Sequence, residues 1–276
     1  MTPGTPATLD QLLEAARRRV EGLYLRRREL ERAAAAAPRR PEFGRALLGA
    51  MVGVIAEVKR RSPSAGTIHA GLDAAGHARD CARGGATAIS VLTDDEHFGG
   101  SIDDLARVAE AVALPVLRKD FVLDGLQLVE ARAAGASAVL LIARVLAGDR
   151  LAELARAAQG LGLAALVEVH SEDELDRALG AGADVVGVNA RDLGSYAVDL
   201  AVVERLMPRV PPDVPAVAES GVSDRADVER IAAAGADLVL VGTALARRPD
   251  AAAAVRELAG VTRRGRRAVW AAGGGS

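Results

Sequence analysis

The stretch GASAVLLI at residues 135–142 contains the pattern that decides the fold, a Gly-Ala pair followed closely by a run of apolar residues. The same pattern begins at Gly85, Gly182 and Gly235, so that these glycines recur at intervals of 50, 47 and 53 residues. Short continuous apolar runs are typical of parallel strands that are buried on both faces. We therefore predict a buried strand in each of the four segments.

Four further strand-like runs alternate with these segments. They are VIAEVK (54–59), PVLRK (115–119), AALVE (164–168) and PAVAE (215–219). Helical patterns, for example over residues 101–112, 147–160 and 223–234, lie between the runs. Strands that alternate with helices indicate right-handed βαβ units. Eight such units in 276 residues favour a closed (β/α)8 barrel, the TIM barrel of the α/β class, over an open sheet.

A helical extension is expected before the first strand. Residues 8–11 (TLDQ) form a capping-box pattern, and apolar residues repeat at helical spacing over 9–23. We expect one helix that runs to about Ala34 and is ended by Pro38 and Pro41. Its apolar face should pack on the barrel exterior, on the barrel mouth or on another subunit. The predicted organisation is an extension (1–45), a catalytic barrel (46–262) and a flexible C-terminal tail (263–276).

The composition is that of an ordinary globular protein, with 50% hydrophobic and 26% charged residues and a formal net charge of −2. This balance predicts neither nucleic acid nor a membrane surface as a partner. The longest apolar stretch, 136–143, is far shorter than the ~20 residues that span a bilayer, and no signal peptide is recognisable. A single cysteine, Cys81, fits a reducing compartment. We expect a cytoplasmic protein, either a monomer or a weak homo-oligomer.

The two lysines stand out from the other basic residues. The chain has 35 lysines and arginines, of which only Lys59 and Lys119 are lysine, leaving 33 arginines. Arginine thus serves wherever a surface positive charge is wanted. Lysine at only two positions indicates a site that needs an amine. An amine is small and can exchange its proton, whereas a guanidinium is larger and stays protonated.

Charged and rare residues gather where the predicted strands end, the face that carries the active site in this fold. These candidate catalytic residues are Glu57, Lys59, Lys119, Glu168, Asn189 and Glu219. Charged groups crowded into a partly dry barrel mouth have shifted pKa values, as proton transfer requires. The alternative is a structural ion-pair network, but five strand ends with such groups would carry a desolvation cost that apolar residues avoid.

A phosphate site is expected beside these residues. Ser220 and Gly221 follow the seventh predicted strand, Gly242 and Thr243 follow the eighth, and Ser62 follows the first. Loops after the last two strands form the usual phosphate site of this fold, because glycine allows close approach of backbone N–H groups. Each glycine alone could be explained by the needs of an ordinary turn. Glycines at corresponding places after two successive strands favour a phosphate site instead.

Neither a metal nor an organic cofactor is expected. The four histidines lie in separate segments without ligand spacing, and Cys81 falls within a predicted helix. The chain also contains no Gly-x-Gly-x-x-Gly or Walker A motif for a nucleotide.

Seven sequence blocks carry the candidate residues. They are IAEVKRRSPSAG (55–66), ISVLTDDEHFGGS (89–101), VLRKDFVLD (116–124), ALVEVHSEDELDRAL (165–179), GVNARDL (187–193), AVAESGV (216–222) and LVGTAL (240–245). In this order, over roughly residues 54 to 250, the blocks resemble the indole-3-glycerol phosphate synthase family. Its reaction converts 1-(2-carboxyphenylamino)-1-deoxyribulose 5-phosphate into indole-3-glycerol phosphate, carbon dioxide and water, in the biosynthesis of tryptophan.

The resemblance implies a role for each candidate residue. Lys119 would be the acid for ring closure, and Glu168, Lys59 and Glu57 would share the proton transfers of dehydration. Asn189 and Glu219 would orient the substrate. The substrate-binding residues would be Arg191 for the carboxylate, Phe98 and Phe121 for the aromatic ring, and Ser62, Ser220, Gly221, Gly242 and Thr243 for the phosphate.

Three positions depart from the family's usual pattern. His97 stands where an aromatic residue is common, Gly125-Leu126 where Pro-Tyr often follows, and Ala190 where threonine is usual. Two alternative functions predict different residues. Another phosphate-binding barrel, such as phosphoribosylanthranilate isomerase, would need a Cys or Asp acid–base pair, and a catalytically silent barrel that acts as a binding module would have lost members of the charged ring.

Overall fold

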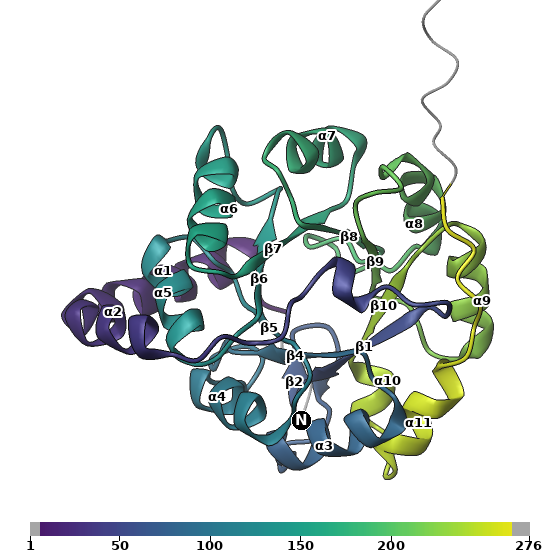
Figure 1. Ribbon diagram of the computed structural model, residues 1–276, viewed down its shortest axis with the longest axis horizontal. Coiled ribbons are helices and arrows are strands. Elements are labelled where there is room, and N and C mark those ends of the chain that lie inside the picture. The colour runs from purple at the N-terminus through teal and green to yellow at the C-terminus, as the bar shows by residue number, and fades with distance from the viewer. Residues whose placement is uncertain (1–5, 267–276) are drawn as a thin grey trace, which may run out of the picture.

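A closed parallel barrel forms the body of the molecule (Figure 1). The computed structural model describes residues 6–266, and within them eight strands close the barrel in the order β1-β10-β9-β8-β7-β6-β5-β4. In chain order the strands are β1 (Gly53–Val58), β4 (Ala88–Leu92), β5 (Val116–Lys119), β6 (Ala138–Ile142), β7 (Ala164–Val169), β8 (Val185–Asn189), β9 (Ala216–Glu219) and β10 (Leu238–Val241). The predicted (β/α)8 barrel is therefore confirmed.

Helices cover the outside of the barrel (Figure 1). They are α3 (Ala74–Gly84), α4 (Ile102–Ala111), α5 (Gly125–Ala133), α6 (Arg150–Gly160), α7 (Glu172–Gly180), α8 (Leu200–Leu206), α9 (Arg225–Ala233) and α11 (Ala251–Leu258). Shorter elements are η1 (Arg45–Leu47), the hairpin of β2 (Arg61–Ser62) and β3 (Gly66–Thr67), η2 (Met207–Arg209) and α10 (Thr243–Ala246).

The repeated Gly-Ala pairs have a structural explanation. Gly85, at the end of α3, adopts a left-handed backbone with φ of 97°, and Gly235, after α9, has φ of 101°. Glycine is the residue that adopts this conformation without a steric penalty, so it stops a helix and turns the chain back. The next buried strand begins three residues after each glycine, at Ala88 and at Leu238. The pattern therefore marks helix-to-strand turns of the barrel.

Apolar side chains form two layers on the two faces of the strands. Ile55, Leu117 and Leu166 belong to the cluster inside the barrel, whereas residues such as Val54 and Val167 pack against the surrounding helices. This follows from the two-residue period of a strand, which sends neighbouring side chains to opposite faces. The interior is a packed core, so a ligand can be held only at its open end.

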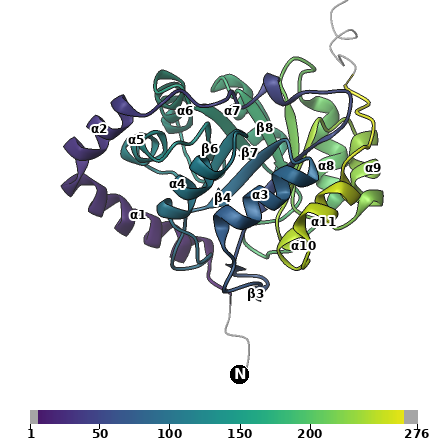
Figure 2. The same cartoon turned by 60° about the horizontal axis from the view of Figure 1, so that its bottom comes forward.

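The N-terminal extension consists of two helices instead of the single predicted one. The helix α1 (Leu9–Leu25) begins at the predicted capping box, and α2 (Arg27–Ala36) follows after a break at Arg26, whose φ and ψ are −108° and 7°. Leu12 of α1 packs with the cluster inside the barrel. The second helix instead packs beside α5, at the flank of the barrel (Figures 1 and 2). The end of α1 also contacts α5, so that Leu23 and Leu30, on either side of the break, pack with Leu126.

The chain after α11 returns to the barrel. Thr262 pairs with Met51, and Asp237 accepts hydrogen bonds from Arg263 and Arg266 at 2.9 and 2.7 Å. Of the tail expected over 263–276, the part from 267 onwards lies outside the described residues. None of the helices between residues 6 and 266 is both long and apolar enough to cross a membrane.

Candidate active site

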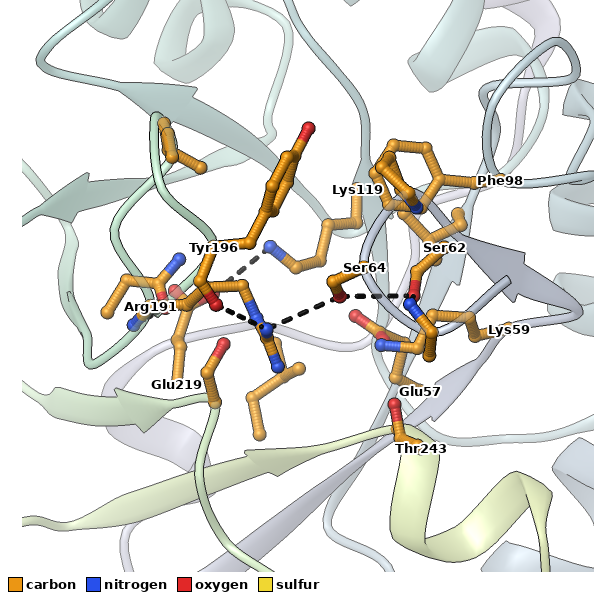
Figure 3. Close-up of a pocket in the computed structure, with 18 of the residues that line it drawn as sticks. Glu57, Lys59, Ser62, Ser64, Phe98, Lys119, Arg191, Tyr196, Glu219 and Thr243 are labelled. Carbon is orange, nitrogen blue, oxygen red and sulfur yellow. Dashed lines mark hydrogen bonds and ion pairs between the residues drawn. The ribbon is translucent and has the colours of Figure 1, made fainter. Parts of the chain in front are cut away.

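A cavity of about 1020 Å³ opens at the C-terminal ends of the barrel strands. Figure 3 shows side chains from several strands and loops that project into it. The sequence-predicted site residues all line this cavity: Glu57, Lys59, Ser62, Phe98, Lys119, Phe121, Glu168, Asn189, Arg191, Glu219, Ser220, Gly221, Gly242 and Thr243. The structure thus brings the predicted set together in one place.

Two lysine–carboxylate groups lie at the centre of the cavity. The Nζ of Lys119, from β5, lies 3.3 Å from an oxygen of Glu168 and 3.1 Å from an oxygen of Glu219. The Nζ of Lys59 lies 2.6 Å from Glu57. These side chains come from β1, β5, β7 and β9, which are alternate strands around the barrel. Alternate strands contribute to the same interior layer, so the predicted convergence is explained by barrel geometry.

The carboxylates keep Lys119 charged. Burial disfavours the ammonium form, but the negative charges of Glu219, Glu168 and Glu57 outweigh burial and raise the pKa of Lys119 above its ordinary value. Lys119 therefore holds its proton at neutral pH. Only a strongly basic partner, such as an alkoxide, would take that proton.

The two carboxylates next to Lys119 differ in protonation. Burial, reinforced by repulsion from Glu168, raises the pKa of Glu219 to about 7, and the attraction of Lys119 offsets only part of this rise. Burial also disfavours the ionised form of Glu168, but the charges of Lys119 and His170 outweigh it and lower the pKa of Glu168. At neutral pH, Glu168 is thus ionised and Glu219 is partly protonated. A site with one carboxylate of each kind can both accept and donate protons.

Asn189 and Arg191 are held by the loop after β8. The side-chain oxygen of Asn189 accepts a hydrogen bond from the backbone N–H of Arg191 at 2.9 Å, and the Asn189 side chain also helps to lower the pKa of Glu168 by hydrogen bonding. The guanidinium of Arg191 donates to the carbonyl of Tyr196 at 2.9 Å and to the hydroxyl of Ser64 at 3.3 Å (Figure 3). Desolvation lowers the pKa of Arg191, yet arginine remains charged at neutral pH. This cation is positioned to meet an anionic group of a ligand.

One rim of the cavity is built from the turns after β9 and β10. Ser220 and Gly221 both have a left-handed backbone, with φ of 65° and 80°. A side chain at Gly221 would lie 2.9 Å from both Leu200 and Val198. Helix α10 begins at Thr243, directly after β10. Non-glycine residues in this conformation concentrate at functional sites, and glycine here keeps the rim open to a ligand.

Gly242 allows a second close approach. A Cβ at this position would lie 2.2 Å from an oxygen of Glu57 and 3.0 Å from Nζ of Lys59. Glycine is therefore required for the ion pair of Glu57 and Lys59 to lie against β10.

The opposite rim is the hairpin of β2 and β3, where the hydroxyls of Ser62 and Ser64 lie 3.5 Å apart (Figure 3).

The remaining wall is apolar. Phe98 and Phe121 line the cavity, together with Leu140 and Ile142 from β6, and Leu12 reaches it from α1. Aromatic and aliphatic walls of this kind suit a flat aromatic ring. The cavity therefore has an apolar part, a charged centre and a rim rich in hydroxyls and glycine.

Several residues at the site were not among the predicted ones. Leu193, Ser195 and Tyr196 line the cavity from the long loop after β8, where no periodic pattern marks them. His170 lies behind Glu168, with its Nε2 at 3.5 Å from a carboxylate oxygen. Its place two residues after Glu168 was a usable signal, because alternate residues of an extended chain point the same way.

The arrangement of ligating side chains does not resemble a metal site. Across residues 6–266, no group of three or more His, Cys, Asp or Glu side chains is placed to hold a metal ion. The basic side chains that line the cavity are Lys59, Lys119, Arg191 and Arg247.

Two solved structures that resemble this chain are proteins whose names refer to phosphate compounds. 3-Hexulose-6-phosphate synthase from Salmonella typhimurium has a TM-score of 0.61 at 18% identity, over 75% of this chain and 96% of that chain. Thiamine phosphate pyrophosphorylase from Pyrococcus furiosus has a TM-score of 0.58 at 19% identity, over 75% of this chain and 93% of that chain. At these identities the likeness concerns the fold alone.

Sequence similarity identifies the family. A model of the family described as indole-3-glycerol phosphate synthase matches residues 9–258. The indole-3-glycerol phosphate synthase of Mycobacterium avium (strain 104) is 48% identical, over 92% of this chain and 94% of that protein. The protein of the same name from Opitutus terrae is 46% identical, over 91% of this chain and 98% of that protein. The chain therefore belongs to the indole-3-glycerol phosphate synthase family.

Proposed function

We propose that this protein catalyses the ring closure, decarboxylation and dehydration that turn 1-(2-carboxyphenylamino)-1-deoxyribulose 5-phosphate into indole-3-glycerol phosphate. The observation that carries the proposal is the charged centre of the cavity. A partly buried ammonium, Lys119, lies within 3.3 Å of two carboxylates that differ in protonation. These groups supply the proton donors and acceptors that the three steps need.

The shape and charge of the cavity support one orientation of the substrate. The aromatic ring would lie against Phe98 and Phe121, and its carboxylate would face the cation of Arg191. The phosphate would lie at the rim formed by Ser220, Gly221 and the start of α10, where backbone N–H groups and hydroxyls can donate. The sugar ketone would then lie between these ends, near Lys119.

Ring closure would use Lys119 as the acid. The ring carbon that carries the carboxylate attacks the ketone carbon, a carbon–carbon bond forms, and the carbonyl electrons move to oxygen. The alkoxide that develops is a strong base and would take the proton of the Lys119 ammonium. Breaking the bond to the carboxylate then releases carbon dioxide and returns its electrons to the aromatic ring.

Dehydration would need an acid and a base in the same cavity. The acid protonates the hydroxyl so that it leaves as water, and the base removes a proton from the neighbouring CH2 carbon to form the new double bond. We assign the base to Glu168, because its lowered pKa keeps it ionised. We assign the acid to Lys59, whose ammonium is held by Glu57 at 2.6 Å. Asn189 and Glu219 would orient the hydroxyl groups of the sugar chain.

An assay of the purified protein tests this function. Addition of the anthranilate-derived substrate should give a rise in indole fluorescence together with one equivalent of carbon dioxide. Phosphoribosylanthranilate, the substrate of the rival isomerase, should be left unchanged. Turnover of phosphoribosylanthranilate, or binding of the first substrate without release of carbon dioxide, would contradict the proposal.

We further propose that the enzyme works in the cytoplasm as a monomer or a weak homo-oligomer, with its phosphorylated substrate as its main partner. The single cysteine, Cys81, cannot form a disulfide within the chain, which fits a reducing compartment. Light scattering during size-exclusion chromatography would measure the oligomeric state, and fractionation of the source cells would give the location.

A further inference from the structure

His170 lies behind the carboxylate to which we assign the dehydration base. It follows β7 directly, two residues after Glu168, and its side chain is only 4% exposed. It does not line the cavity of about 1020 Å³, so it is not expected to contact a ligand. Any effect of His170 on the reaction must therefore pass through Glu168.

The two nitrogens of the His170 ring face two different carboxylates. Nδ1 lies 3.1 Å from an oxygen of Glu174 on α7, and the same oxygen accepts the backbone N–H of His170 at 2.7 Å. Nε2 lies 3.5 Å from Oε1 of Glu168. Both atoms of this second contact are buried and have no hydrogen-bond partner among residues 6–266. A buried polar atom without a hydrogen-bond partner destabilises the fold, so a small movement that brings Nε2 and Oε1 into a hydrogen bond is favoured.

The other oxygen of Glu168 faces the cavity. Oε2 lies 3.3 Å from Nζ of Lys119, whereas Oε1 is turned towards His170. The carboxylate is thus held between a cation on the cavity side and an imidazole on the protein side. With one oxygen fixed by His170, the second can point only into the cavity, which is where a base must act.

Charges around His170 favour its protonated form. The groups that face it are Glu168 from β7, Glu174 from α7 and Arg144 from the loop after β6. Burial and Arg144 lower the pKa of His170, but the hydrogen bond that it donates to Glu174 and the negative charges of Glu168 and Glu174 outweigh them and raise it. Glu174 is itself held by Nε of Arg144 at 3.0 Å. An imidazolium can donate from both nitrogens at once, one to each carboxylate.

We propose that His170 is a positioning residue for Glu168, which it orients by donating from Nε2 to Oε1 while Glu174 fixes the other side of the ring. This inference rests on the proposed role of Glu168 in turnover. Outer partners of this kind fix the orientation of a reactive group, and their loss lowers the rate more than it weakens binding. The competing explanation is that His170 only ties β7 to α7 through Glu174.

A pair of variants separates the two explanations. In His170→Asn, the side-chain amide can reach the position of Nδ1 and keep the contact with Glu174, but nothing replaces Nε2. In His170→Gln, the longer amide can reach the position of Nε2 and donate to Glu168. We expect kcat of His170→Asn to fall about 10- to 100-fold with KM changed less than about twofold. His170→Gln should retain a clearly larger share of kcat.

Thermal unfolding of both variants provides the control for the fold. A wild-type kcat in His170→Asn would overturn the proposal, because this variant keeps the contact to α7 and loses only the contact to Glu168. A loss of kcat in His170→Gln alone, with His170→Asn active, would overturn it as well and assign the ring to the structural link with Glu174.

A measurement that does not depend on turnover tests the same contact. The chain has only four histidines, His69, His77, His97 and His170, so their imidazole signals can be assigned by NMR. Glu168→Gln removes the negative charge next to Nε2, and the titration midpoint of His170 should shift to lower pH. His77 is buried in the outer layer on α3 and serves as the reference that should not move.

The kinetic and the NMR experiments distinguish a failure of the coupling between His170 and Glu168 from a failure of the proposed function. An unchanged midpoint of His170 in Glu168→Gln would refute the coupling, whatever the enzyme does with its substrate. A shifted midpoint supports the coupling even if the wild-type protein does not form the indole product, and in that case only the proposed function fails.

Discussion

Arg19 of helix α1 donates a hydrogen bond to Asp120, with 2.7 Å between Nη2 and Oδ1, and Asp120 immediately follows Lys119. The other terminal nitrogen of Arg19 lies 2.9 Å from an oxygen of Asp94, in the loop after β4. Both carboxylates are buried, and the negative charge of Asp120 is also balanced by Arg118. The extension is therefore tied to the strand end that carries the proposed acid.

Replacement of Arg19 by methionine should weaken substrate binding and destabilise the fold. Methionine keeps much of the aliphatic length but leaves Asp94 and Asp120 without this partner, and an unsatisfied buried charged group costs about 1–3 kcal/mol or more. We expect a raised KM, because the strand end shifts when the ion pair is lost. Denaturant unfolding and steady-state kinetics would measure the two effects.

The adjacent residue supplies a matched control. Arg18 pairs with Glu96 at 2.8 Å, but both side chains are about half exposed, at 52% and 51%. Surface ion pairs contribute about 0–1 kcal/mol, so Arg18→Met should change stability and KM little. Equal effects of the two substitutions would show that the contact with Asp120 has no special importance.

Much of the barrel and the site followed from local patterns in the sequence. The strands are continuous apolar runs, and the left-handed glycines at Gly85 and Gly235 mark helix ends. The site residues were found because they end these runs, and the barrel topology brings the strand ends together. The apolar run AISVL (88–92), which follows Gly85-Ala86, coincides with β4. The run AVLLI (138–142), which follows Gly135-Ala136, coincides with β6.

Long-range contacts could not be predicted in this way. The break at Arg26 leaves Leu23 of α1 and Leu30 of α2 both packed with Leu126 of α5, and no local signal in the sequence shows this packing. The pairing of Arg19 with Asp120 joins residues 101 positions apart. The direction of the Lys119 pKa also needed the structure, because burial and three carboxylates act in opposite senses.

Glu168→Gln should leave the fold and substrate binding intact while turnover falls. The amide keeps the shape of the carboxylate and can still contact Lys119, but it cannot accept a proton at neutral pH. Loss of one general acid–base group costs about 10²–10⁴ in rate. A rate within a few-fold of the wild-type value would reduce Glu168 to an orienting role.

Gly221→Val should raise KM strongly. The backbone at Gly221 has φ of 80°, and a Cβ there would lie 2.9 Å from Val198 and Leu200. The turn must therefore move, and the backbone N–H groups that we assign to the phosphate would move with it. Calorimetry should show that a phosphate ester of the product type loses affinity for the variant. Its dephosphorylated analogue should bind both proteins equally weakly, and loss of affinity for both ligands would place the phosphate elsewhere.

The raised pKa of Glu219 predicts a pH dependence of stability. Its pKa is about 7 in the folded protein against 4.5 in the unfolded chain, so between these values the folded state binds more protons. The free energy of unfolding should therefore fall as pH rises from about 4.5 towards 7, by an amount on the order of 3 kcal/mol. Chemical denaturation at pH 5 and pH 8 would measure this fall. Glu219→Gln, which cannot ionise, should lose most of it, and an equal fall in both proteins would assign it to other groups.

Lys119→Arg should abolish ring closure although it conserves the charge. The cavity holds the ammonium of Lys119 within 3.3 Å of Glu168 and Glu219, and a planar guanidinium at the end of a longer side chain does not fit the same point. The guanidinium charge is also spread over a rigid planar fork, so no single N–H takes the place of the compact ammonium beside the developing alkoxide. We expect the rate of carbon dioxide release in a single turnover to fall by about 10²–10⁴.

Lys59→Arg is the matched comparison, because it changes the other lysine of the same cavity. We assign Lys59 to the later dehydration, so this variant should release carbon dioxide at close to the wild-type rate in a single turnover and form the indole slowly. Rapid quenching with detection of both products separates these steps, because ring closure precedes loss of carbon dioxide and dehydration follows it. If Lys119→Arg releases carbon dioxide at the wild-type rate while Lys59→Arg does not, the two assignments must be exchanged, and Lys59 becomes the acid for ring closure.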